Sequence, residues 1–139
     1  MKMSKATRRK FLPGLMVPAV MMGDNTKKLP DFTYTVKETT EIQETFGIHR
    51  KYFEGPTDQL KLMVAGSVTL NPGTTPHPPH AHEEEEIMVV TEGTGIIGLN
   101  GKDKAVGPGS MMYSAANKMH DIRNTGKAAL TFFYYKWKA

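Results

Sequence analysis

The amino-acid sequence predicts a single all-β domain, built as a small closed barrel or a sandwich. Short segments rich in β-branched and aromatic residues recur along the chain, several of them with alternating apolar and polar positions. Gly and Pro clusters separate these segments, and no window of about ten or more residues carries a helical apolar stripe. The 139 residues suffice for one hydrophobic core. Many short strands joined by turns are typical of barrels and sandwiches.

The expected strands follow one another from a polar linker to the carboxyl end of the chain. The first, residues 32–39, alternates in hydrophobicity. The other expected strands share its composition and are residues 51–53, 60–70, 87–92, 94–99, 102–106, 110–113, 120–124 and 129–137. The cluster Glu-Gly-Pro-Thr-Asp at 54–58 predicts a turn. Asn100-Gly101 predicts a two-residue hairpin, because a type I′ turn requires positive φ at both central positions.

Charge is unevenly distributed along the chain. The net charge is +4, but residues 1–23 carry five of the 18 Lys and Arg and none of the 14 Asp and Glu. Residues 24–139 therefore carry 13 basic and 14 acidic residues. This nearly neutral body lacks the basic footprint that binds nucleic acid. The absence of cysteine excludes disulfides, thiolate chemistry and cysteine–zinc sites.

The basic amino-terminal stretch is typical of an export signal. Arg8-Arg9 is followed by Phe11-Leu12 and by a short, weakly apolar run that ends at Gly23. This order resembles the twin-arginine signal of bacterial precursors, and the run is far shorter than the ~20 residues that span a bilayer. We expect the export machinery for folded proteins to carry the chain to the periplasm or outside the cell; the alternative is a disordered basic tail. The predicted signal, linker and domain are residues 1–23, 24–30 and 31–139.

Two histidines and a glutamate are spaced as metal ligands on an extended chain. His80 and His82 are one residue apart, so both project to the same side of a strand but not of a helix. Glu86 follows at an even spacing and falls on that side as well. Two imidazoles and a carboxylate suit a first-row divalent metal, and His120 can supply a third imidazole. The competing interpretation is a pair of solvated loop histidines.

Glu86 ends a run of four glutamates, which is also compatible with a simple solvated acidic patch. Alternation along a strand sends Glu83 and Glu85 outward and puts Glu84 on the side of the ligands. We expect Glu84 to lie in the loop at the mouth of the site rather than to bind metal.

Three further residues are candidates for a pocket around the metal. His77, in a stiff Pro-His-Pro-Pro loop, is either an entrance residue or a surface histidine. Met88 shares the ligand side by alternation and is either a pocket wall or plain core. Tyr113 is a candidate pocket hydroxyl. His49 has no motif around it, and we assign it no role.

The spacing of these residues resembles the two conserved motifs of the cupin family. The first block reads Gly73-x6-His80-x-His82-x3-Glu86-x6-Gly93, with one more residue before the first histidine than the usual pattern. The second block reads Gly109-x5-Ala115-x-Asn117-x2-His120-x3-Asn124. Ala115 takes the usual Pro place and Asn117 the usual second Gly place. Asn tolerates the left-handed conformation better than most residues other than Gly.

This resemblance implies a cupin double-stranded β-helix, the conical β-barrel or jelly roll of the family, with a metal in its interior. The implied metal ligands are His80, His82, Glu86 and His120. The implied structural positions of the motifs are Gly73, Gly93, Gly109, Asn117 and Asn124. The resemblance also implies a homodimer, for which residues 32–39 are the candidate strand for pairing across subunits.

Such a centre favours chemistry on a small molecule. Three neutral imidazoles and one carboxylate leave about one unit of positive charge on a divalent ion, which favours a small oxyanion or a sugar-acid-like ligand. The ligand types suit Mn, Fe, Ni, Co or Zn, and open coordination positions favour a catalytic role. Cupins include dioxygenases, isomerases and lyases, so we favour an exported metal-dependent enzyme of one of these types. The alternatives are a non-catalytic metal- or small-ligand-binding cupin module and a storage-protein-like structural role.

Overall fold

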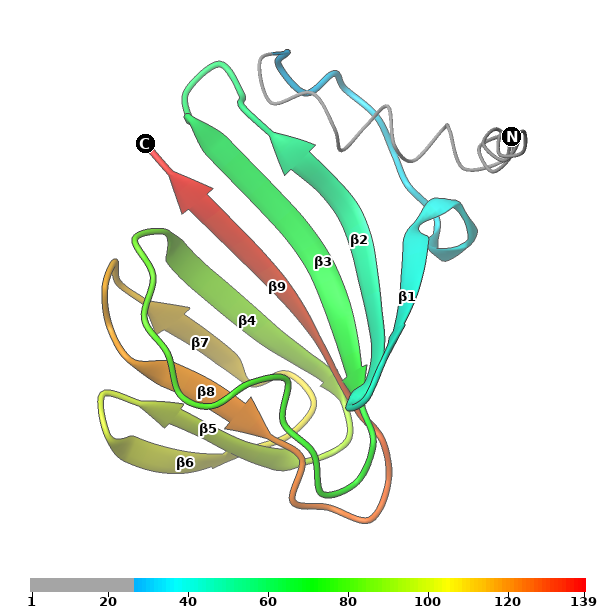
Figure 1. Cartoon of the computed structure of the whole chain (residues 1–139), viewed down its shortest axis with the longest axis vertical. Helices are drawn as coiled ribbons and strands as arrows, with labels where there is room; N and C mark the ends of the chain where they lie inside the picture. The colour runs from blue at the N-terminus through cyan, green and yellow to red at the C-terminus, as the bar shows by residue number, and fades with distance from the viewer. Residues whose placement is uncertain (1–26) are drawn as a thin grey trace, which may run out of the picture.

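The computed structural model describes residues 27–139 of the chain, and the predicted export signal lies outside the described residues. Antiparallel strands form two sheets (Figure 1). In this part of the chain no helix is long and apolar enough to cross a membrane. The strands are β1 (Thr40–Glu44), β2 (Gly47–Gly55), β3 (Leu62–Leu70), β4 (Glu85–Glu92), β5 (Gly95–Leu99), β6 (Lys102–Val106), β7 (Met111–Ser114), β8 (His120–Arg123) and β9 (Leu130–Lys138).

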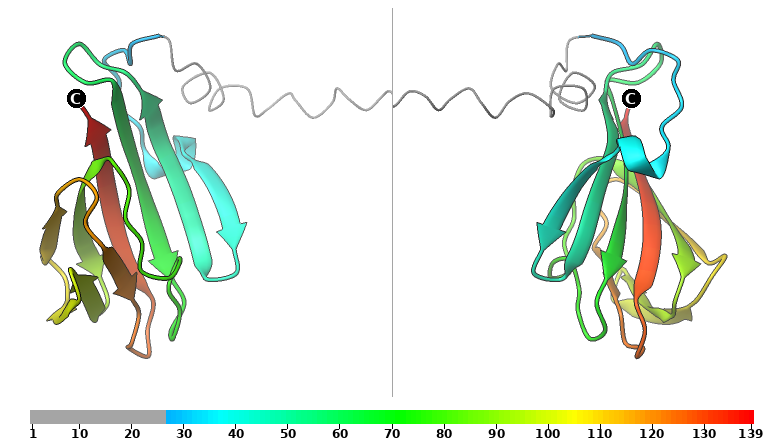
Figure 2. Two further views of the ribbon diagram at one scale, coloured as in Figure 1. Left: turned by 60° about the vertical axis from the view of Figure 1, so that its left-hand side comes forward. Right: turned by 90° about the vertical axis from the view of Figure 1, so that its right-hand side faces the viewer.

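The last strand of the chain connects the two halves of the larger sheet. That sheet has the strand order β1-β2-β3-β9-β4-β7, and the smaller sheet has the order β6-β5-β8. Strand β9 therefore lies between β3 and β4 and pairs with both. The smaller sheet forms a second layer beside β4 and β7 (Figures 1 and 2). This two-layered arrangement of antiparallel strands confirms the predicted all-β fold class.

Most of the predicted strands and the predicted hairpin are confirmed. Strands β3 to β9 coincide with predicted segments to within a few residues at each end. Asn100 and Gly101 have φ values of 53° and 81° and join β5 to β6, as a type I′ turn requires. Strand β2 is longer than the predicted 51–53, because it pairs with β3 along its length and accommodates a bulge between Lys51 and Phe53.

The prediction of a strand at residues 32–39 is wrong. Val36–Glu38 is a single turn of 3-10 helix. The carboxylate of Glu38 accepts hydrogen bonds from the backbone N–H and the hydroxyl of Thr35, at 2.7 and 2.5 Å. Local capping of this kind competes with strand pairing. Residues 32–39 thus provide no strand for pairing across subunits, and the homodimer stays a prediction.

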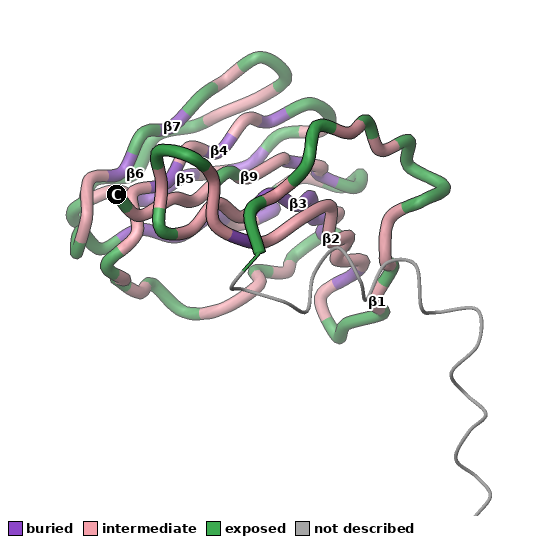
Figure 3. The backbone as a smooth tube through the Cα atoms, turned by 90° about the horizontal axis from the view of Figure 1, so that it is seen from above, coloured by how far each residue is buried: buried purple, intermediate pink, exposed green. Residues whose placement is uncertain are grey.

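The hydrophobic core lies between the two sheets. Its members alternate along their strands with residues that face outward. The buried core residues are Val68, Leu70, Met88, Val90, Ile97, Met112, Ile122, Leu130 and Phe132. Figure 3 shows the buried segments along the strands, whereas the connecting loops are largely exposed. Full burial of one such side chain stabilises the fold by about 1.5–3 kcal/mol, so the core holds β4 and β8, from which ligands are expected, in place.

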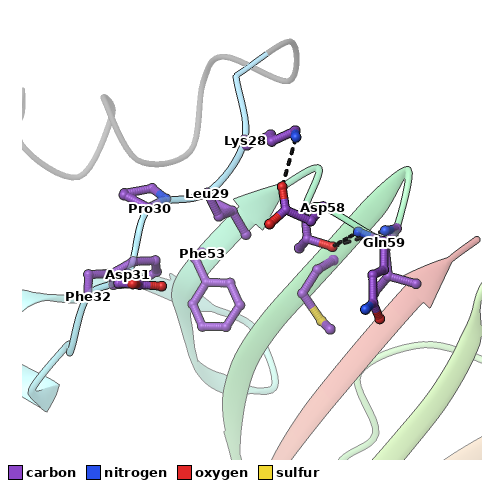
Figure 4. Close-up of a pocket in the computed structure, with 11 residues that line it drawn as sticks. Lys28, Leu29, Pro30, Asp31, Phe32, Phe53, Asp58 and Gln59 are labelled. Atoms are coloured by element: carbon purple, nitrogen blue, oxygen red, sulfur yellow. Dashed lines mark hydrogen bonds and ion pairs between the residues drawn. The ribbon is translucent and has the colours of Figure 1, made fainter.

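The amino-terminal end of the described chain packs against β2 and the turn that follows it (Figure 4). The ammonium group of Lys28 forms an ion pair with Asp58 at 2.7 Å. The ring of Phe32 packs edge-on against Phe53, with ring centroids 5.2 Å apart. The described part of the predicted linker is therefore held against the domain.

Candidate metal centre

The four predicted metal ligands lie close together. His80 and His82 are in the loop before β4, Glu86 is in β4, and His120 is the first residue of β8. The ligand nitrogens of the three histidines lie within 4.8 Å of one another. Oε1 of Glu86 lies 2.8 Å from Nε2 of His82 and 3.1 Å from Nε2 of His120. One strand from each sheet and one loop thus contribute to a single cluster.

The loop that carries the first two histidines is held by hydrogen bonds to the second motif. The backbone N–H groups of His80 and His120 donate to each other's carbonyl oxygens, at 3.1 and 2.9 Å. The N–H of Asn117 donates to the carbonyl oxygen of His82 at 2.7 Å. Asn117 has a φ of 63°, the left-handed conformation expected at its place in the motif. The second motif therefore positions the ligands of the first.

Backbone carbonyl groups set the orientation of two imidazole rings. Nδ1 of His82 lies 3.0 Å from the carbonyl oxygen of Glu84, and Nδ1 of His120 lies 3.0 Å from that of Lys118. A carbonyl oxygen only accepts hydrogen bonds, so Nδ1 carries the proton in both rings. The neutral form of each ring then keeps a lone pair on Nε2, and both Nε2 atoms face the carboxylate of Glu86. Carbonyl groups support ligating histidines in this way at many metal sites.

The donor set fits a divalent metal ion. Two lone-pair nitrogens and a carboxylate oxygen are all acceptors, so they repel one another unless a cation or a proton lies among them. Glu86 is 4% exposed and His120 is 1% exposed, and solvent therefore screens this repulsion little. With His80, the cluster offers three nitrogens and a carboxylate, a combination that suits first-row divalent metals.

The ionisation of these groups is coupled. Burial raises the pKa of Glu86. Without a metal, the Nε2–H groups and the charge of protonated His120 and His82 outweigh burial and leave this pKa below its usual value. Burial lowers the pKa of His120, yet the hydrogen bond to Glu86 and other contacts raise it above its usual value overall. Burial lowers the pKa of His80 to about 4, and the neighbouring histidines add to this decrease. His80 is therefore neutral near pH 7, with a lone pair available.

A cavity of about 230 Å³ opens onto this cluster. Its apolar wall consists of Phe46, Val68, Met88 and Phe132. Two of the predicted pocket residues, Met88 and His77, thus line it. The ring of His77 stacks on that of His80, with centroids 3.7 Å apart.

Tyr113 does not line this cavity, contrary to the prediction. Its side chain is 52% exposed, and its hydroxyl donates a hydrogen bond to Oε2 of Glu85 at 3.0 Å. In β7 the preceding residue, Met112, is buried in the core. Because side chains alternate along a strand, Tyr113 faces the opposite side.

Three polar residues of the cavity carry no motif in the sequence. His49 in β2 and Tyr134 in β9 lie side by side, with Nε2 and the hydroxyl oxygen 2.7 Å apart. Burial lowers the pKa of His49 and raises that of Tyr134. Lys136, also in β9, is the third. The one available signal is alternation in β9, which puts Tyr134 and Lys136 on the same face as the buried Phe132.

The four consecutive glutamates have different environments, so the run is not a simple acidic patch. Glu83 and Glu85 pair with side chains of β9 away from the cluster, as alternation predicts. Glu84 lies in the loop before β4, with a carboxylate oxygen 3.3 Å from Nδ1 of His82. Glu86 alone points into the centre, where it contacts two imidazoles.

The remaining motif residues form turns and one buried hydrogen-bonding centre. Gly73, Gly93 and Gly109 have φ values of 77°, 80° and 91°. At Gly93 a Cβ atom would also lie 2.2 Å from the carbonyl oxygen of Ala129, so only glycine fits. Asn124 is 1% exposed. Its side chain donates to two backbone carbonyls, at 3.0 and 2.9 Å, and accepts from a backbone N–H at 2.9 Å.

Solved structures of other proteins share this fold. An RmlC-like cupin from Shewanella frigidimarina NCIMB 400 has a TM-score of 0.64 at 13% identity, over 79% of this chain and 93% of that one. A predicted oxalate decarboxylase from Thermotoga maritima has a TM-score of 0.62 at 22% identity, over 78% of this chain and 100% of that one. At these identities the likeness shows a common fold.

One curated relative is the HTH-type transcriptional activator RhaS of Klebsiella pneumoniae (strain 342). It is 34% identical over 59 residues, which are 42% of this chain and 21% of the relative. The chain thus spans about a fifth of the length of this curated relative.

The sequence pattern of a known family covers the candidate centre. The cupin domain pattern matches residues 66–135, about half of the 139-residue chain. This range contains His80, His82, Glu86 and His120 together with the turns that hold them. The chain therefore belongs to the cupin domain family.

Proposed function

We propose that this chain is a metal-dependent cupin enzyme that acts on a small oxygen-rich molecule. The supporting observation is the convergence of three imidazoles and one carboxylate beside a cavity of about 230 Å³. In this proposal the metal ligands are His80, His82, Glu86 and His120. A barrel that only encloses a ligand has no need to retain such a set of donors.

The donor set suits Mn, Fe, Co, Ni or Zn. A bound ion of this kind polarises a carbonyl or hydroxyl oxygen and lowers the pKa of the group that carries it. Because the four protein ligands contribute one negative charge, a small oxyanion or sugar-acid-like ligand is favoured. We propose a reaction of the dioxygenase, isomerase or lyase type. An isomerase or a lyase would use a substrate oxygen activated in this manner, and a dioxygenase would in addition consume dioxygen at a redox-active ion such as Fe.

The residues that line the cavity shape the space beside the metal cluster in which the proposed reaction would take place. Val68, Met88 and Phe132 form an apolar surface that limits the access of water to the bound molecule. The ring of His77 stacks on His80 and restricts the movement of that ligand. His49, Tyr134 and Lys136 add polar groups to the wall of the cavity, so a bound acid is oriented rather than merely enclosed.

Turnover by the full chain tests this proposal. The protein is loaded in turn with Mn, Fe, Co, Ni and Zn and incubated with α-hydroxy, α-keto and sugar acids under air, while products are followed by NMR and oxygen by an electrode. We expect one acid to be converted by wild type and not by His82→Ala prepared in the same way. Absence of conversion by every metal-loaded wild-type form would argue against an enzyme.

A non-catalytic ligand-binding module is the second candidate. The observation that favours it is the 34% identity to part of a transcriptional activator, which is a regulator rather than an enzyme. The two candidates differ in a simple respect. A binding module holds an acid that NMR recovers unchanged after long incubation, whereas an enzyme consumes it.

We further propose that residues 1–23 direct export to the bacterial periplasm as a folded protein. The support is the paired Arg8-Arg9 before a short apolar run. Replacement of both arginines by lysine keeps the charge and should retain the protein in the cytoplasm of a bacterial host. An unchanged distribution between cytoplasm and periplasm would contradict export by this route.

A further inference from the structure

The cavity has a second polar region, formed by β2 and β9 rather than by the ligand-bearing segments. In the pairing of β4 with β9, Tyr134 lies opposite Met88 and Lys136 lies opposite Glu86. Paired residues of neighbouring strands project to the same face of a sheet. Tyr134 and Lys136 therefore face the same side as the metal cluster, and both line the cavity.

The position of the Tyr134 hydroxyl is specified by three adjacent strands. The side chain extends from β9 across β3 and reaches Nε2 of His49 in β2, at 2.7 Å. It crosses β3 at Gly66, where a Cβ atom would lie 2.4 Å from the hydroxyl oxygen. The glycine thus leaves the space that the tyrosine occupies, and His49 fixes the end of its side chain.

Lys136 places a positive charge near the ring of Tyr134. Its ammonium nitrogen lies 5.9 Å from the centroid of the Tyr134 ring. Within residues 27–139, no carboxylate lies within ion-pair distance of it. The side chain of Lys136 is half-buried at the wall of the cavity, and a negatively charged ligand there would give its ammonium group an ion-pair partner.

The charges and the size of the cavity define a class of ligand. Glu86 and Lys136 are the two lining residues with fixed charges, of opposite sign. A divalent ion on the cluster therefore leaves two positive charges to be balanced. The volume of about 230 Å³ is below the ~300–1,000 Å³ of common ligand pockets. A dianion of a few carbon atoms meets both conditions.

We propose that Lys136 and the Tyr134 hydroxyl form an anion-binding subsite that selects small organic dianions for the metal centre. The inference rests on the proposed function, because the metal is what binds the other end of the dianion. Lys136 supplies the charge that discriminates a dianion from a monoanion. When Nε2 of His49 carries the ring proton and donates it to the Tyr134 oxygen, the Tyr134 hydroxyl is free to donate a directed hydrogen bond to the dianion.

Calorimetric titration of the Mn-loaded full chain tests this subsite. The probes are malonate and malonamate, which have nearly the same size and differ by one negative charge. We expect wild type to bind malonate more tightly than malonamate. In Lys136→Met the ratio of the two dissociation constants should fall by about tenfold or more. Lys136→Arg keeps the charge and should keep most of the preference. Tyr134→Phe should weaken binding of malonate without abolishing the preference.

Metal content and thermal unfolding of each variant accompany the titrations. The Lys136→Met variant can stay folded, hold its metal and still prefer malonate as strongly as wild type. That result overturns the proposed subsite and leaves the proposed metal-dependent function standing. Binding of neither probe by Mn-loaded wild type also overturns it. A wild-type chain that takes up no metal at all overturns the proposed function, and this inference with it.

Discussion

The backbone N–H of Asn117 donates a hydrogen bond to the carbonyl oxygen of His82, with an N···O distance of 2.7 Å. This contact joins a turn of the second motif to a ligand of the first. It requires Asn117 to hold a φ of 63°, which few residues adopt without strain. The geometry of the metal cluster therefore depends on a backbone contact of Asn117 as well as on the ligand side chains.

Substitutions of Asn117 can show whether its backbone conformation or its side chain matters for stability and metal binding. We expect Asn117→Ala to destabilise the fold by about 1 kcal/mol, because alanine is strained in the left-handed region. Displacement of the His82 carbonyl should weaken metal binding by about tenfold. Asn117→Gly, the matched control, should keep both properties near wild type. Urea unfolding measures the stability of the two variants, and metal titration measures their affinity. Equal stability and equal affinity in Asn117→Ala and Asn117→Gly would contradict a role for the left-handed backbone at this position.

The space above Gly66 gives a second prediction. In Gly66→Ala the new methyl group would lie 2.4 Å from the Tyr134 hydroxyl and 2.7 Å from the carbonyl oxygen of Arg50. We expect the tyrosine to move from His49 and the free energy of unfolding to fall by about 1–3 kcal/mol. Gly107→Ala is the control, because its nearest neighbour would be 3.7 Å away.

Fluorescence of Trp137, the single tryptophan, reports unfolding in urea for both glycine variants. The control should stay within about 0.5 kcal/mol of wild type. A Gly66→Ala protein as stable as the control would show that the tyrosine does not need this space.

Asn124 should act on stability rather than on the metal. Replacement by alanine leaves two backbone carbonyls and one backbone N–H without their partner. Because each such group is costly when buried, we expect a loss of about 2 kcal/mol or more, with metal stoichiometry unchanged in the folded protein. Asn71→Ala, at an exposed position, should have little effect. Loss of metal from folded Asn124→Ala would contradict a purely structural role.

The ligands could be predicted from the sequence, because metal binding needs particular donor atoms at particular spacings. His80, His82 and Glu86 lie within seven consecutive residues, and an extended chain brings such neighbours to one side. His120 was predictable only through its place in the second motif. Its spatial neighbour Ser114, whose hydroxyl lies 3.2 Å from Nδ1 of His120, had no comparable signal.

The far walls of the cavity could not be predicted, because they depend on strand register. His49 and Tyr134 are 85 positions apart and meet only because β3 lies between β2 and β9. A shift of one residue in either pairing would turn one of them outward. The bulge after Lys51 is such a shift, and no residue type marks it in advance.

Two predictions are wrong for local reasons, namely Tyr113 as a pocket residue and the strand at residues 32–39. In Met111-Met112-Tyr113 consecutive residues are all apolar or aromatic, so alternation does not reveal which one faces the core. Residues 32–39 alternate like a strand, but Thr35 and Glu38 cap a 3-10 turn instead. The strand that follows this segment, β1 (Thr40–Glu44), contains only one large apolar residue, Ile42, and therefore gave a weak signal.

The metal content of the purified full chain tests the central claim most directly. Protein made without a histidine tag is exposed to Mn, Fe, Co, Ni and Zn, dialysed and analysed for bound elements. We predict about one equivalent of one divalent metal in wild type and in His77→Ala, which alters a cavity residue outside the cluster. His82→Ala and His120→Ala should retain almost none and should lose the thermal stabilisation that metal gives wild type. Equal metal content in all four proteins, or none in wild type, would contradict the account.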